Sequence, residues 1–441
     1  MGLFSGIGMV VANMIGAGVF LSAGFMAQEM SPQQILIAWT LGMLIAITGA
    51  KAYSGIVQLV PQSGGEYRFL STLIHPALGY LAGWASLLVG FSAPIAVCAL
   101  AAGAFASVLF PEINMTMVSV LVIVSLTAAH SVGMRISITA QNMLVAIKIL
   151  LVAGFIIVGL LYGNNAWPEW TPPKNPDELS VGSFMRNLFY ITFTFSGWNA
   201  AIYAASEFKN PKRDVPRAMV LGCLIVGILY FLINWIFVAN LSPEQARIVF
   251  AYETERVTLG HLIMENILGK TGAACMSIFV IVAFISSASA MTFLGPRVCA
   301  VMAEDHFLPA ILKGREGKPP VGAILLQGTL SLVLVLAYQL QEALSNVGAI
   351  LTLFSALTVF SLFWVCFKRR EYPRPAPLTL LAGAVYLGIS IVMLYFGFSE
   401  SPTLNLWVGI CSIAALIGYC LSKRKMTGTP QTERPSKRTL P

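Results

Sequence analysis

The chain has 441 residues, of which 57% are hydrophobic and only 10% are charged, and its formal net charge is +8. A soluble domain carries roughly 25% charged residues, so the composition excludes an ordinary soluble enzyme. The charge does not indicate nucleic-acid binding either, because the basic residues collect in alternate loops between apolar runs. Each run has about 20 residues, enough to cross a hydrocarbon core of about 30 Å. We therefore expect an all-α membrane protein.

The apolar runs predict about twelve transmembrane helices. The predicted spans are residues 4–27, 33–58, 78–107, 114–131, 138–162, 183–207, 216–240, 270–303, 320–339, 343–367, 376–397 and 403–422. An even number of spans places both termini on the same side of the membrane.

The distribution of basic residues predicts the orientation. If the N-terminus lies inside, most of the 27 Lys and Arg residues fall in inner loops or in the tail 423–441. The outer segments keep only Lys174, Arg186, Arg247, Arg256 and Lys270. Because positive charge marks the cytoplasmic side, we expect both termini in the cytoplasm of a multi-pass protein of the cell membrane, plasma or inner. The basic tail is predicted to be disordered.

The sequence gives no sign of a disulfide framework, a metal site or a catalytic site. The seven cysteines all fall within predicted spans and none forms a C-x-x-C pair, so no disulfide framework, metal site or cofactor is expected. A catalytic site would need acids, histidines or a metal converging at one depth, and the spans contain no such set. The chain is not expected to be an enzyme.

Two predicted spans contain glycine in their interiors, where it costs roughly 1 kcal/mol relative to alanine. The first span carries NMIGAGVFLS from Asn13 to Ser22, and the sixth carries ITFTFSGWNAA from Ile191 to Ala201. One interpretation is close packing between helices, because glycine is frequent in membrane helices. The other is a break in each helix, at matching positions of two repeats, which points to a substrate site.

A break at mid-membrane frees backbone N–H and C=O groups, which is tolerable only where they face protein or a wet cavity. Freed N–H groups near Gly18 would attract a carboxylate, and freed C=O groups of the preceding half-helix would attract an ammonium. Gly16 and Gly18 would leave room for the backbone to approach a ligand. Two adjacent breaks therefore suit the zwitterion of an α-amino acid.

Four stretches resemble the amino acid–polyamine–organocation superfamily, in its bacterial amino-acid permease and L-type exchanger branch. IGAGVF resembles the first-helix IG[ST]GIF pattern, and VPQSGGEYRFL at 60–70 resembles the P-x-S-G-G-E-Y segment. FSGWNAAIYAASEFKNPKRDVPRA at 195–218 resembles the sixth helix and the following loop. ISSASAMTFLGPRVCAVMAEDHFLP at 285–309 resembles the eighth helix and its exit. The order and spacing of these stretches cover most of the chain.

The resemblance implies a fold of two inverted five-helix repeats, 1–162 and 183–367, followed by two further helices in 376–422, and transport by alternating access. It also implies a set of substrate-binding groups on the first and sixth helices. The carboxylate would be held by backbone N–H groups of Ala17, Gly18 and Val19, the amino group by the carbonyls of Met14, Phe193 and Ser196, and the side chain by Trp198 and Asn199. Phe193 resembles the aromatic residue that caps the site from outside.

Lys148, in VAIKILL, lies near the middle of the fifth span, where a charged residue is costly and suggests a function. In the resembling family, a lysine here takes the position of a sodium ion and bridges the first and eighth helices. The resemblance implies Ser286 or Ser287 as its partner, with carbonyls near Gly16. Three interpretations stay open: a fixed charge that replaces sodium, a proton-coupling group, and a snorkelling side chain.

The nineteen acidic residues fall in loops or near span ends. A cationic substrate normally meets an acid inside the membrane, so we expect a neutral zwitterion rather than a polyamine or lysine. Lys51 lies nearer the inner end of the second span, where we expect it to snorkel inward. Gly55 stands where the family pattern has a glutamate, and Lys51 is left without an obvious acidic partner.

The sequence thus predicts a sodium-independent secondary transporter of neutral L-amino acids, working by proton symport or by exchange. The alternatives are a non-transporting amino-acid sensor of the same fold and a transporter of amines or cationic amino acids. The expected partners are the amino-acid substrate, protons in the case of symport, and the lipid bilayer, with no nucleic acid. Some members of the family join a glycoprotein subunit through a cysteine after the third span. The loop FPEINMT has none, so no disulfide-linked heavy subunit is expected.

Overall fold

The computed structural model describes residues 1–132, 134–168, 170–171, 180–246, 259–314, 318–337, 340–369 and 371–400, with positions 405, 408–409, 412–413, 416–420 and 422 beyond them. The described residues form helices and connecting segments without any β-strand. The bilayer explains this, because a membrane-spanning chain must satisfy its backbone groups internally and a helix does so within one segment.

The first half of the chain forms helices of 9 to 29 residues. They are α1 (Leu3–Met14), α2 (Ala17–Met26), α3 (Pro32–Leu59), α4 (Gly65–Leu73), α5 (Pro76–Ala85), α6 (Ala93–Leu109), α7 (Met115–Val132) and α8 (Met134–Tyr162). A π-helical segment, Ser86–Ser92, joins α5 to α6, so that the three pieces make one span from Pro76 to Leu109.

The second half begins with another interrupted span. Its helices are α9 (Val181–Thr194), α10 (Ala200–Tyr203), α11 (Pro211–Ala239), α14 (Leu259–Glu304), α15 (Val321–Ala337), α16 (Leu340–Lys368) and α17 (Pro377–Glu400), with short 3-10 turns at Ala205–Glu207 and Ala310–Leu312. Gly269 divides α14 at a positive φ of 71°. A short helix therefore precedes the long span, in the stretch HLIMENILG that the sequence predicts to be weakly amphipathic and interfacial.

The described part contains eight helices long and apolar enough to cross a membrane, or nine if α1 and α2 count as one broken span. This confirms a polytopic all-α membrane protein. The predicted number of twelve is not reached, because α9 has only 14 residues and α15 only 17. The predicted last span, 403–422, and the basic tail lie largely or wholly outside the described residues.

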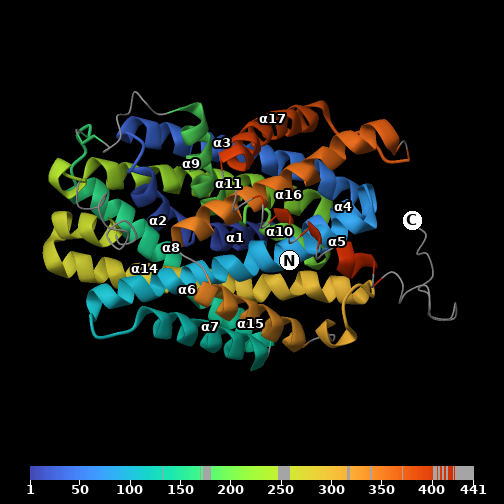
Figure 1. The fold of residues 1–441 in the computed structure, drawn as a ribbon, viewed down its shortest axis with the longest axis horizontal. Coiled ribbons are helices and arrows are strands. Elements are labelled where there is room, and N and C mark those ends of the chain that lie inside the picture. Colours follow the sequence, from blue (N-terminus) through green and yellow to red (C-terminus); the bar gives the residue numbers. More distant parts are fainter. Residues whose placement is uncertain are drawn as a thin grey trace.

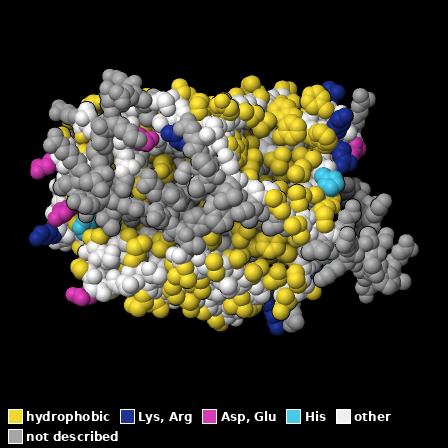
Figure 2. Space-filling model, viewed as in Figure 1, with side chains coloured by type: hydrophobic (Ala, Val, Ile, Leu, Met, Phe, Trp, Pro, Cys, Tyr) yellow, Lys and Arg dark blue, Asp and Glu magenta, His cyan; other side chains and the backbone are white. Residues whose placement is uncertain are grey.

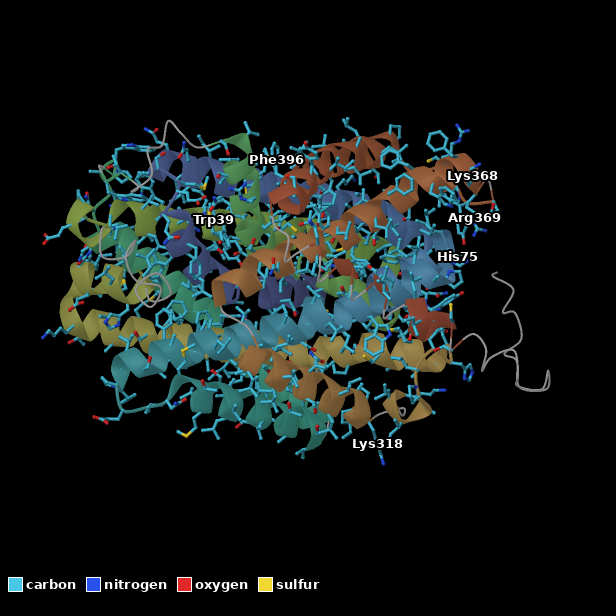
Figure 3. The ribbon with its side chains drawn as sticks, in the orientation of Figure 1. Trp39, His75, Lys318, Lys368, Arg369 and Phe396 are labelled. Carbon is cyan, nitrogen blue, oxygen red and sulfur yellow. The ribbon has the colours of Figure 1, made fainter. Side chains whose placement is uncertain are left out.

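The helices lie roughly along the long axis of the molecule, with α1 and α10 near the centre (Figure 1). α3 packs along α11, α6 along α14, and α9 along α16. Where the visible face is described, hydrophobic side chains dominate it to the right of the centre and along its lower part, whereas most charged side chains lie toward the two ends (Figure 2). Lys318, Lys368 and Arg369 lie toward the same end as His75 (Figure 3). This is the pattern of a protein that spans a membrane along its long axis.

Candidate functional site

The first span is interrupted at two residues, as the sequence predicts. α1 ends at Met14, α2 begins at Ala17, and the two half-helices meet at an angle of 40°. Ile15 and Gly16 between them have extended backbone, with ψ of 98° and −157°. A carbonyl before such a break has no helical N–H four residues ahead of it, and it needs another donor.

The sixth predicted span is interrupted as well, between Thr194 and Ala200. Gly197 has a φ of +95°, a left-handed conformation that glycine adopts at little cost. A Cβ at this position would lie 2.9 Å from the backbone carbonyl carbon of Asn13. The two interruptions therefore lie against each other. Gly197 is needed there for two reasons: its positive φ disfavours other residues, and a side chain would clash with the backbone of Asn13.

Lys148 binds the carbonyls freed at the first break. Its ammonium donates to the backbone oxygens of Ala12 and Ile15, each at 2.6 Å, and lies 3.2 Å from Ser287 Oγ. The Ser287 hydroxyl also donates to Ile15 O at 2.8 Å. Because Lys148 is completely buried and has three oxygen partners, its position does not fit a snorkelling side chain. The lysine joins α8, the broken α1 and α14.

The structure separates the two neighbouring serines that the sequence left as alternatives. Ser287 contacts Lys148, whereas the Ser286 hydroxyl is buried without a hydrogen-bond partner among the described residues. A further contact at the break comes from α11: the Tyr230 hydroxyl donates to Met14 O and, at 3.2 Å, to Thr194 O. Tyr230 thus joins the carbonyls of both broken spans, a role that the sequence did not reveal.

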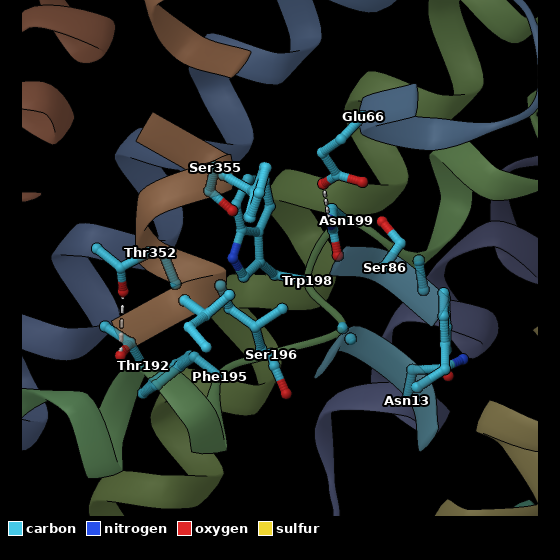
Figure 4. A pocket seen from close by; sticks show the side chains of 18 of the residues that line it. Asn13, Glu66, Ser86, Thr192, Phe195, Ser196, Trp198, Asn199, Thr352 and Ser355 are labelled. Carbon is cyan, nitrogen blue, oxygen red and sulfur yellow. Dashed lines mark hydrogen bonds between the residues drawn. The ribbon is translucent and has the colours of Figure 1, made fainter. Parts of the chain in front are cut away.

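A cavity opens beside the second break (Figure 4). It is bounded by α1, α3, α4, the π-helical segment, the turn between α9 and α10, α14, α16 and α17. The polar residues of its wall are Asn13, Glu66, Ser86, Thr192, Ser196, Asn199, Tyr203, Thr352, Ser355 and Tyr386. Its apolar wall includes Trp198. The Trp198 ring packs edge-on against the ring of Tyr53, with 4.7 Å between the ring centroids. Such a mixed wall suits a small amphipathic ligand.

The cavity brings together some of the predicted site residues. Ser196, Trp198 and Asn199 line it. The described wall does not include Met14, Gly16, Gly18, Val19 or Phe193, and the side chain of Ala17 lies outside the described atoms.

Packing explains the position of Gly18. A Cβ there would lie 2.3 Å from Thr194 Oγ1 and 2.7 Å from Thr194 Cα. The glycine therefore allows α2 to pack closely against α9, which is the close-packing interpretation of this residue. Phe193 is buried on α9, two residues from Phe195, which does line the cavity. The roles that the resemblance implies for Gly18 and Phe193 in binding stay predictions.

A buried carboxylate also faces the cavity, and it corrects the inference that acids are absent from the binding region. Glu66 is only 4% exposed. Its Oε1 accepts from Asn199 Nδ2 at 2.6 Å and from the Tyr53 hydroxyl at 3.0 Å, and its Oε2 accepts from the Tyr203 hydroxyl at 2.6 Å. The charge is held by three neutral donors, and one of them belongs to the half-helix α10.

The local backbone explains why a residue from the segment after α3 reaches this depth. Gly64 and Gly65 have φ values of +116° and +57°, so the chain reverses sharply and α4 turns back toward the bundle. Tyr67 donates to Asp305 Oδ2 at 2.5 Å and Arg68 forms an ion pair with the same oxygen at 3.0 Å. Burial, together with the neighbouring carboxylate, raises the pKa of the Tyr67 hydroxyl, which keeps it a donor. These contacts anchor α4 to the end of α14.

Comparisons with known proteins agree with this architecture. The amino acid permease family matches residues 1–420. The human large neutral amino acids transporter small subunit 2 (Homo sapiens) is 26% identical, over 97% of this chain and 79% of the relative. The b(0,+)-type amino acid transporter 1 of Mus musculus is 23% identical, over 95% and 87% respectively. The corresponding human b(0,+)-type transporter is 24% identical, over 96% and 87%. Because the match extends over nearly the whole chain, the protein belongs to the amino acid permease family.

Proposed function

We propose that this protein is a sodium-independent secondary transporter of neutral L-amino acids that works by alternating access. The observation that carries the proposal is the pair of adjacent helix breaks, at Ile15–Gly16 and around Gly197, with a cavity beside them. Unwound backbone at this depth is tolerated only where it faces protein or a wet cavity. Membership of the amino acid permease family and the names of the relatives support amino acids as the substrate.

Lys148 supports independence from sodium. Its ammonium occupies a set of oxygen ligands, from Ala12, Ile15 and Ser287, of the kind that unwound carbonyls offer to a sodium ion in transporters with broken helices. Because the ammonium already occupies these oxygens and repels another cation, a sodium ion is not expected to bind here. Both a fixed charge and a proton-coupling group are compatible with this geometry, so symport and exchange both remain in the proposal.

For the substrate, we propose that the backbone N–H groups of Ala17, Gly18 and Val19 bind the carboxylate, while the carbonyls of Met14, Phe193 and Ser196 bind the amino group. Met14 O already accepts from Tyr230, but a carbonyl has two lone pairs and can accept a second donor. The substrate side chain would then point toward Trp198 and Asn199 in the cavity.

The carboxylate of Glu66 is compatible with neutral substrates. Three of its lone-pair positions already accept hydrogen bonds from Tyr53, Asn199 and Tyr203, and a hydrogen-bonded carboxylate in such a network needs no additional cation. A cationic side chain would find only one of the roughly four lone-pair positions of this carboxylate free. We therefore expect neutral amino acids to be preferred over lysine, arginine and polyamines.

Purified protein reconstituted into liposomes tests the proposal. We expect uptake of labelled neutral amino acids, driven by an inward proton gradient or by unlabelled amino acid preloaded in the lumen, with no stimulation by sodium. A panel that includes lysine, arginine and putrescine measures the preference. If no amino acid enters under either driving force, the transport proposal is wrong, and saturable binding without counterflow would identify a sensor instead.

The organisation of the chain is part of the proposal. We infer two inverted repeats, 1–162 and 183–367, followed by a pair of helices in 376–422. Both termini would be cytoplasmic in the cell membrane, an orientation supported by the gathering of Lys318, Lys368 and Arg369 at one end (Figure 3). Labelling of single introduced cysteines from either side of the membrane tests this orientation.

We also propose that the chain works without a disulfide-linked heavy subunit. The human relative carries "small subunit" in its name, so a partner has to be tested directly. The segment between α6 and α7, residues 110–114, contains no cysteine that could form such a bond. Uptake by the purified chain alone, and equal migration on reducing and non-reducing gels, are expected. A larger species that disappears on reduction would contradict this part.

A further inference from the structure

A second groove lies apart from the cavity, between α3, α11 and the start of α17. It is lined by Leu3, Lys51, Ser54, Gln58, Lys212, Arg213, Pro216, Arg217, Val220, Leu221 and Thr379. Four of these residues carry a positive charge and none carries a negative charge. The groove also offers hydroxyl and amide groups, so its polar part is equipped to bind an anion.

No acid in the described part of the chain forms an ion pair with these cations. Lys51, Lys212, Arg213 and Arg217 form none of the ion pairs seen there, and Asp214, on the same turn of α11, is not paired with any of them. Like charges held together repel unless a counter-charge lies between them. The four cations of the groove therefore have no ion-pair partner among the described residues, and an anion bound there would reduce their mutual repulsion.

Two of the cations lie well inside the ends of their helices. Lys51 precedes the end of α3 by eight residues and Arg217 follows the start of α11 by six, which places them about 12 Å and about 9 Å from those ends. A charge at such a depth in a membrane protein usually pairs with another group. Snorkelling would explain Lys51 alone, but it does not explain why Arg217 and two further cations converge on it.

The groove continues into apolar surface. On α3, Ile37 and Leu44 precede Lys51 by fourteen and seven residues, so all three share one helix face, and the two apolar side chains are 60% and 51% exposed. On α11, Leu221 and Ile228 are 40% and 50% exposed, on the same face as the groove. A ligand that fits both parts has an anionic head and apolar chains.

We propose that this groove binds the phosphate-bearing headgroup of an anionic phospholipid, with the acyl chains along the exposed faces of α3 and α11. Basic pockets between transmembrane helices recognise such headgroups. Free phosphate shares the charge of the head, but it would leave the apolar faces unused. The site gives Lys51 the anionic partner that the sequence lacks, and it is independent of the amino-acid site.

The test compares charge-matched variants in nanodiscs of phosphatidylcholine with and without phosphatidylglycerol. Retention of phosphatidylglycerol is measured by native mass spectrometry for the wild type, for Lys51→Gln/Arg217→Gln, and for the control Lys313→Gln/Lys368→Gln. Lys313 and Lys368 lie outside the groove. Each cation near an anionic surface contributes about fivefold in affinity. We therefore expect the groove variant to lose roughly twenty-five-fold in affinity while the control stays close to the wild type.

Equal losses in the two double variants would show a general effect of net charge and overturn the proposal. Inorganic phosphate and glycerol phosphate form the second arm: if they compete as well as the lipid does, the ligand is a soluble phosphate and the lipid assignment fails. A third arm needs no variant. Photoactivatable phosphatidylglycerol should label peptides of α3 and α11 in the wild-type protein, and labelling confined to other helices would also overturn the proposal.

Discussion

The ammonium of Lys148 lies 2.6 Å from the carbonyl oxygen of Ile15, the residue at which the first span is broken. The lysine comes from α8 and is completely buried, so its charge is stabilised by the oxygens freed when the helix unwinds. The break and the lysine therefore depend on each other. Unpaired carbonyls inside the membrane are costly, and an unpaired ammonium is costlier still.

Replacing Lys148 by alanine is expected to abolish uptake and to destabilise the protein. It leaves Ala12 O without the donor seen here, and a buried unsatisfied acceptor costs about 1–3 kcal/mol. Uptake in liposomes and the thermal unfolding midpoint measure the two effects. If exchange survives while uptake driven by a proton gradient is lost, Lys148 is a proton-coupling group. If both are lost together, it is a fixed charge. Wild-type activity in the variant would contradict the assignment.

Replacing Glu66 by glutamine is expected to slow transport about tenfold or more, because hydrogen bonds to a charged group are worth about 1.5–3 kcal/mol. The amide keeps the size of the side chain but replaces one acceptor oxygen with a donor. Its one oxygen can still accept from Asn199 and Tyr53, but its NH2 group cannot accept from Tyr203 as Oε2 does here. Initial uptake rates measure the change. Tyr203→Phe removes one of the three bonds and should give a smaller loss, and a larger loss than in Glu66→Gln would contradict this order.

Replacing Gly197 by alanine tests the contact between the two breaks. A residue with a Cβ costs about 1–2 kcal/mol in the left-handed conformation, and here its Cβ would also meet the backbone of Asn13 at 2.9 Å. We expect a lower unfolding midpoint and loss of substrate binding. Gly388→Ala is the matched control, since a Cβ there meets nothing within 4 Å. It should be neutral or slightly stabilising, by up to about 1 kcal/mol.

The sequence was informative where a local pattern carries the geometry. Glycines inside apolar runs indicated both breaks, and one lysine in the middle of a span indicated a buried charge that binds the first break. Glu66 was missed as a cavity residue because its position depends on Gly64 and Gly65 reversing the chain, a tertiary effect that hydropathy does not register. The motif SGGEY contained the signal, because two glycines before an acid permit such a turn.

Tyr230 was missed for a different reason. Its hydroxyl reaches Met14 O from α11, and the packing of α11 against α1 cannot be read from the order of the spans. The assignment of Gly18 to ligand binding rested on the absence of a side chain. A missing side chain can make room either for a ligand or for a neighbouring helix. Only the folded structure reveals that Thr194 lies against Gly18.

Replacing Gly18 by alanine distinguishes these two explanations. If the glycine serves mainly helix packing, the added Cβ would meet Thr194 Cα at 2.7 Å, and overpacking of this kind costs about 1–3 kcal/mol. The unfolding midpoint of the ligand-free protein should fall. Gly154→Ala in α8 is the control, since nothing lies within 4 Å of a Cβ there. A variant with an unchanged midpoint but weakened amino-acid binding would favour the ligand-binding role instead.

The neighbouring residues Ser286 and Ser287 provide the most stringent test of the lysine site, because alanine replaces serine at two adjacent, completely buried positions. Ser287→Ala removes the hydroxyl that donates to Ile15 O at 2.8 Å and faces Lys148 at 3.2 Å, and we expect a loss of about 1–3 kcal/mol. Ser286→Ala removes a hydroxyl without a partner in the described part of the chain. Since burying an unbonded hydroxyl is itself unfavourable, that variant should be as stable as the wild type or more stable. Thermal unfolding and uptake, measured on both variants in the same detergent and lipid, report the difference. Equal losses of stability and uptake would mean that both hydroxyls contribute to the lysine site. A larger loss in Ser286→Ala would show that Ser286, not Ser287, is the partner of Lys148.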